Sequence, residues 1–79
     1  MISIAIKETT NTYIIDVPYY VSSITQLKNY ILSFKTNYMY NNLKLVLLDN
    51  NNNGSYVSDN FKIENNDIYI LSIVPIILD

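Results

Sequence analysis

Two groups of polar residues in this chain have types and spacings that could do chemistry. Ser22 and Ser23 precede Lys28 by a few positions, and a serine activated by a neighbouring lysine is a nucleophile in some hydrolases. The stretch from Asp49 to Gly54 places Asp, Asn and Asn at alternate positions before a glycine. That spacing matches the first half of a calcium-binding loop.

Each group also has a structural interpretation, which we favour. Ser23 with Gln26 three residues later matches a capping box, in which the serine begins a helix; Lys28 then lies on the exposed face of that helix. The calcium loop lacks its bidentate glutamate, because its twelfth position is Asn60. The chain contains no His and no Cys, so the commonest general bases and thiol nucleophiles are absent. We therefore expect no enzyme, no cofactor and no metal site.

One segment has a clear helical period. Behind the serine cap, apolar residues recur at helical spacing and predict one amphipathic helix over about residues 23–35. The members of this stripe are Ile24, Leu27, Ile31 and Phe34.

The rest of the chain has the patterns of strands and turns. Strands are predicted by alternation or by short apolar runs at residues 2–7, 13–17, 43–48 and 67–74. The first two form a hairpin, and Pro18 ends it because proline cannot donate to a ladder. Residues 49–55 and 65–66 are turns, with Gly54 free to adopt a positive φ. Pro75 ends the last strand and begins an apolar tail, residues 75–79.

The order hairpin, helix, strand, turn, strand predicts a single domain over residues 1–79 of α+β class. One helix covers one face of a four-to-five-stranded mixed sheet, and the other face is left bare. The first and last strands become parallel neighbours at the centre, joined through a crossover that contains the helix. That arrangement is the ubiquitin-like β-grasp.

The composition of the chain argues against two classes of protein, those that bind nucleic acid and those that span a membrane. The net charge is −2 with only 5 Lys and Arg residues, which argues against nucleic acid, since nucleic-acid binding needs a basic surface. No apolar run approaches the roughly 20 residues of a membrane-spanning helix, and the alternating start is unlike a signal peptide. We expect a soluble globular domain with no membrane insertion.

Two stretches carry a closer resemblance. Val17-Pro18-Tyr19-Tyr20-Val21, leading into the helix, is similar to the V-P-x-Y-x-P/S entry of the YukD/EsaB family of bacterial type VII secretion systems. Residues 61–71, FKIENNDIYIL, resemble that family's Y-x-I-x-D/N-G-D-x-L-x-L ending, with Asn66 where the family usually has glycine. The resemblance implies a small, cytoplasmic, ubiquitin-like protein that works by protein contacts.

The same resemblance gives a candidate site. Alternation places several apolar side chains on the bare face of the sheet, and Val46, Tyr69 and Leu71 match the apolar interaction patch of ubiquitin. The candidate partner-binding residues are Val46, Leu48, Tyr69, Leu71 and Ile73. A shift of one residue in a strand would exchange its two faces, and the tail could instead fold over this surface.

The expected function is a non-catalytic adaptor or regulator of a type VII secretion system. It would bind a protein partner, such as a component of the secretion machinery, or a second copy of itself. Conjugation is not expected, because ubiquitin-type conjugation needs a terminal Gly-Gly and Gly54 is the only glycine. The alternative is a ubiquitin-like module of viral or eukaryotic origin that occupies ubiquitin-binding partners without being conjugated.

Overall fold

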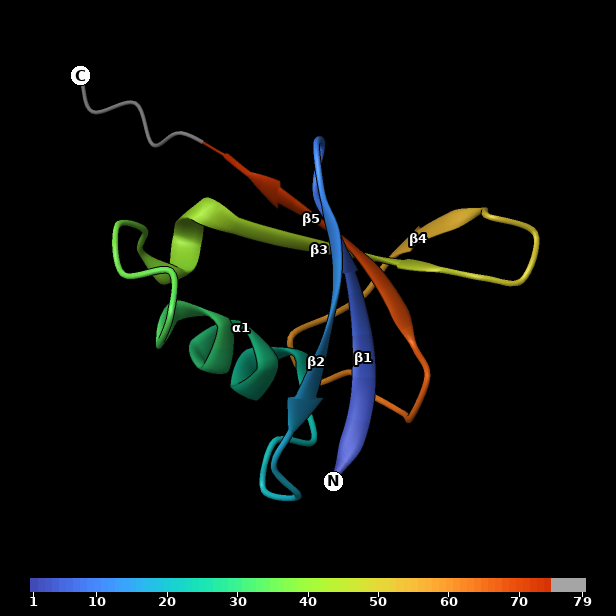
Figure 1. Cartoon of the computed structure of the whole chain (residues 1–79), viewed down its shortest axis with the longest axis horizontal. Coiled ribbons are helices and arrows are strands. Elements are labelled where there is room, and N and C mark those ends of the chain that lie inside the picture. Colours follow the sequence, from blue (N-terminus) through green and yellow to red (C-terminus); the bar gives the residue numbers. More distant parts are fainter. Residues whose placement is uncertain (75–79) are drawn as a thin grey trace.

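The computed structural model describes residues 1–74, which form one mixed sheet with one helix on one of its faces (Figure 1). The sheet has five strands in the order β2-β1-β5-β3-β4. The elements in chain order are β1 (Ile2–Lys7), β2 (Thr12–Val17), α1 (Ile24–Leu32), the short 3-10 helix η1 (Tyr40–Asn42), β3 (Leu43–Leu48), β4 (Gly54–Tyr56) and β5 (Ile68–Ile73).

The strand pairing is that of a ubiquitin-like β-grasp. β1 pairs antiparallel with β2 and parallel with β5, while β3 pairs antiparallel with both β5 and β4. The predicted α+β class and the parallel pairing of the first and last strands at the centre of the sheet are therefore confirmed. In residues 1–74, no helix is long and apolar enough to cross a membrane.

The helix begins where its sequence predicted and ends earlier. The Gln26 backbone N–H donates to Ser23 Oγ at 3.3 Å, and the Ser23 backbone N–H donates to Gln26 Oε1 at 3.2 Å, so the capping box is present. At the other end, Ser33 Oγ donates to the Tyr30 carbonyl at 2.6 Å, which satisfies a carbonyl of the last turn. Phe34 then lies outside the helix and is 48% exposed, so its assignment to the buried stripe was wrong.

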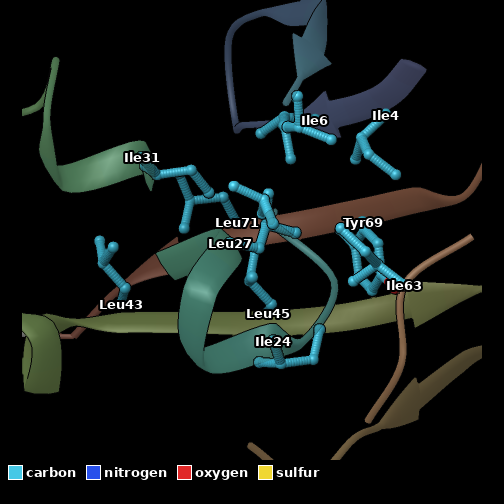
Figure 2. Packing of buried hydrophobic residues seen from close by; sticks show 12 residues of the cluster. Ile4, Ile6, Ile24, Leu27, Ile31, Leu43, Leu45, Ile63, Tyr69 and Leu71 are labelled. Carbon is cyan, nitrogen blue, oxygen red and sulfur yellow. The ribbon is translucent and has the colours of Figure 1, made fainter. Parts of the chain in front are cut away.

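The core lies between α1 and the inner face of the sheet (Figure 2). The helix contributes the remaining three members of its stripe, and alternate residues of four strands face them. The buried residues are Ile4, Ile6, Val17, Val21, Ile24, Leu27, Ile31, Leu43, Leu45, Ile63, Tyr69 and Leu71. Burying this surface is the main force that holds the helix to the sheet.

In both predicted turns an asparagine, and not the glycine, takes the left-handed conformation. Asn52 has φ 62° and Asn66 has φ 70°, and the prediction of a positive φ at Gly54 is wrong. Asparagine tolerates this region better than other residues with side chains. Asn66 therefore adopts a conformation that glycine also takes readily, and Gly54 instead begins β4.

Candidate functional site

The outer face of the sheet, opposite α1, is the candidate site, but β5 contributes to it differently from the prediction. Tyr69 and Leu71 are 0% and 4% exposed and belong to the core, and Ile73 packs half-buried against it. Figure 2 shows Tyr69 and Leu71 in the layer between the sheet and α1. The three residues therefore face inward, and their assignment to the outer face was wrong; Ile68 and Ile70 point outward in their place.

A tyrosine fills a core position because its hydroxyl reaches a partner. Tyr69 Oη donates to Asp67 Oδ2 at 2.9 Å, and Asp67 Oδ2 also accepts the Glu64 backbone N–H at 2.8 Å. Burial, followed by the hydrogen bond and the charge of Asp67, raises the pKa of the Tyr69 hydroxyl well above its usual range. Tyr69 thus ties the start of β5 to the preceding turn while its ring fills the core.

The other strand of the prediction has the expected phase. In β3, Leu43 and Leu45 are buried whereas Val46 and Leu48 alternate with them on the outer face. The register places Val46 between Ile70 of β5 and Tyr56 of β4. Leu48 lies between Ile68 and Gly54 in the same way.

These neighbours form a continuous apolar surface, which we call the outer patch. Its members are Val46, Leu48, Tyr56, Ile68 and Ile70. Tyr56, Ile68 and Ile70 were absent from the predicted site. The prediction lacked the pairing of β3 with β5. Because Leu45 lies opposite Leu71, the buried face of β3 determines which residues of β5 are buried.

Gly54 shapes one end of the outer patch. A Cβ atom at this position would lie 2.8 Å from Val46 Cγ1 and 3.8 Å from Leu48 Cδ2. The first distance is shorter than a side-chain contact permits. The absence of a side chain therefore lets Val46 lie across the end of β4, whereas the distance to Leu48 is an ordinary contact.

Charged side chains border the outer patch on its two sides. Lys44 places its Nζ 4.4 Å from the centre of the Tyr56 ring, a cation–π contact, and Lys7 lies beside Ile70 on β1. At the opposite end of the outer face, Asp16 accepts a hydrogen bond from Ser3 Oγ at 2.8 Å. An apolar centre with a charged border is the usual composition of a protein-binding surface.

The serine–lysine group has a structural role. Ser22 Oγ and Ser23 Oγ both donate to Gln26 Oε1, at 2.9 and 3.4 Å. Lys28 Nζ lies 3.4 Å from Asp59 Oδ1 and 4.9 Å from the centre of the Tyr40 ring. These contacts assign the serines to the helix cap and direct the lysine to other partners.

The asparagine-rich loop uses its carboxylate to close a turn. Asp49 Oδ1 accepts the backbone N–H groups of Asn51 and Asn53 at 2.8 and 2.9 Å. These two hydrogen bonds, that of Asn53 first, lower the pKa of the Asp49 carboxyl. Among residues 1–74, no three Asp, Glu, His or Cys side chains come together in a way that could hold a metal ion.

A comparison with models of known protein families gives no match to this chain, and a search of curated proteins gives none either. The outer patch and the motifs of the sequence are therefore the features that indicate a function. The predicted tail, residues 75–79, lies outside the residues that the structure describes.

Proposed function

We propose that this chain is a non-catalytic, ubiquitin-like interaction module that binds a protein partner through its outer patch. The resemblance of residues 17–21 and 61–71 to the YukD/EsaB family supports a role as an accessory regulator of a bacterial type VII secretion system. On this proposal the partner is a component of the secretion machinery, and the chain acts without being conjugated.

The observation that supports this proposal is the outer patch itself. Five apolar side chains on three adjacent strands lie on the face that α1 leaves uncovered. Contiguous apolar surface of this kind marks protein-binding sites, whereas scattered apolar residues do not. Lys7 and Lys44 beside it favour a partner whose contact surface has an acidic border.

The test is a double substitution, Val46→Asp with Ile70→Asp, which places two charges in the centre of the patch. The matched control is Tyr19→Asp, because Tyr19 is 89% exposed and lies in the loop before α1, outside the outer patch. The probes are the purified soluble portion of a type VII membrane ATPase and a small WXG-type substrate of such a system. Binding is measured by calorimetry, and folding by urea unfolding.

We expect the double variant to remain folded and to lose at least tenfold in affinity, while the control binds as the native chain does. Equal binding by the double variant would exclude the outer patch as the binding surface. If neither probe binds the native chain, the secretion role is wrong.

A further inference from the structure

The free edge of the sheet at β2 offers a second, independent surface. β2 is the last strand on its side, with no strand beyond it among the described residues. The N–H and C=O groups of Glu8 and Asn11 bond each other across the hairpin at 2.7 and 3.4 Å. Because such pairs alternate along an antiparallel ladder, the backbone groups of Tyr13 and Ile15 point toward β1. Those of the alternate residues of β2 point away from the sheet.

The residues on this free edge are Thr12, Ile14 and Asp16. Within residues 1–74, the one partner found for their outward backbone groups is the Tyr30 hydroxyl, which donates to the Asp16 carbonyl at 3.3 Å. Natural proteins block such edges with proline, charged side chains (lysine above all) or short strands. β2 has six residues, contains neither proline nor lysine and has Asp16 as its one charged residue, so most of its edge remains able to accept another strand.

We propose that two copies of the chain pair through β2, antiparallel, with Ile14 opposite Ile14 of the second copy. The side chains of β2 are self-complementary in this register. Ile14, which is 72% exposed, meets its own equivalent. Thr12 lies opposite Asp16, so a hydroxyl donor faces a carboxylate acceptor, and on the inner face Tyr13 lies opposite Ile15.

The other symmetric registers are poorer. Pairing centred on Asp16 places two carboxylates opposite each other, and pairing centred on Thr12 places Asp16 opposite Glu8; like charges at such positions are destabilising. Pairing centred on Ile15 places Ile14 opposite Asp16, and pairing centred on Tyr13 places Ile14 opposite Thr12, so both lose the apolar Ile14 pair. Centring on Ile14 instead separates the two Asp16 residues by about 14 Å along the strands, at about 3.4 Å per residue. That distance exceeds the Debye length of about 8 Å.

This pairing joins the outer faces of the two copies. Its two-fold axis is perpendicular to the sheet, so both copies of α1 lie on the same side of one ten-stranded sheet. In each copy, cross-strand neighbours on the outer face form a row that begins at Ile14 and continues through Ala5, Ile68 and Leu48. The two rows meet at the Ile14 pair, and the two outer patches therefore face the same direction on a single surface.

The inner side of the edge is also open to a second copy. A groove of about 520 Å³ lies between β2 and α1. Its apolar lining includes Tyr13, Ile15, Tyr30 and Phe34, and the last two rings contact edge-to-face at 6.1 Å. In the paired state the two grooves flank the new strand pair.

Single cysteines test the register directly, because the native chain contains none. Opposite residues in the hydrogen-bonded pairs have Cα atoms about 5.5 Å apart, within the disulfide range of about 4.4–6.8 Å. We expect Ile14→Cys to form a disulfide-linked dimer under mild oxidation. Thr12→Cys alone and Asp16→Cys alone should not, since each residue is about 14 Å from its equivalent. An equal mixture of these two should form the linked heterodimer.

The native chain should also show a monomer–dimer equilibrium in sedimentation, and Ile14→Asp should remain monomeric at concentrations where the Tyr19→Asp control dimerises. A native chain that stays monomeric would overturn the proposal, as would a Thr12/Asp16 mixture that forms no link. The patch variant Val46→Asp with Ile70→Asp should keep the dimer. Loss of edge pairing and loss of partner binding are therefore measured separately.

Discussion

Replacing Leu71 by alanine should destabilise the protein much more than replacing its neighbour Ile70. Both substitutions remove three carbon atoms from adjacent positions in β5, so they are matched in chemistry. Leu71 is 4% exposed and packs within the core, whereas Ile70 lies on the outer face, opposite α1. The comparison isolates the effect of which face each side chain occupies.

The magnitudes follow from burial. Three buried carbons at about 0.8 kcal/mol each give about 2.4 kcal/mol for Leu71. The cavity left beneath α1 raises the total to about 2.5–5 kcal/mol. Ile70 is half-buried among its cross-strand neighbours and leaves no enclosed cavity, so its loss should be about 1–1.5 kcal/mol. For a domain of this size, the Leu71 variant should melt at least about 10 °C below the native chain.

Urea unfolding followed by far-UV circular dichroism measures both free energies, and the slope against urea should stay constant if only stability changes. Equal losses, or a larger loss for Ile70→Ala, would refute the assignment of Leu71 to the core and of Ile70 to the outer patch. A second pair in β3 provides the internal control. Leu45→Ala should behave as the Leu71 variant does, and Val46→Ala, which removes two carbons where the others remove three, should lose no more than the Ile70 variant does.

The remaining predictions concern pH and a turn. Burial, followed by the charge of Glu8, raises the pKa of Tyr13 to about 12, and the pKa of Tyr69 is raised further. Because the unfolded chain loses these protons near pH 10 while the folded chain retains them, stability should fall as pH rises above about 10. Guanidinium unfolding at pH 8 and 11 measures this, and Tyr69→Phe should reduce the fall; a pH-independent stability would contradict it. In the turn before β5, Asn66→Gly should be tolerated because φ is 70° there, whereas Asn66→Val should cost about 1–3 kcal/mol. Equal melting temperatures for these two variants would contradict the left-handed conformation.

For the helix and three of the four predicted strands, the sequence shows which face is buried, because one face of each is distinctly more polar. In β1, Ser3 and Lys7 alternate with isoleucines, and in α1 the polar residues lie off the stripe. β3 has a lysine at its second position, which identifies the outer face there. Periodicity is informative in these elements because water and core each select a different class of residue.

β5 could not be oriented in this way. Its sequence, IYILSI, has aliphatic residues at both phases, so alternation fits either face. The resemblance to the apolar patch of ubiquitin placed Tyr69 and Leu71 on the outer face. The structure buries the Tyr69 ring instead, because the Asp67 carboxylate satisfies its hydroxyl.

The sequence by itself determined the class of the fold, the order of its elements, the helix cap at Ser23 and the phase of β3. These depend on local spacing and on capping chemistry, which neighbouring residues specify. Only the tertiary structure decided the composition of the outer patch and the existence of a free, self-complementary edge at β2. Both depend on which strand lies beside which. The strand order, in which β5 lies beside β3 and β2 lies at the edge of the described sheet, is set by contacts between residues far apart in the chain.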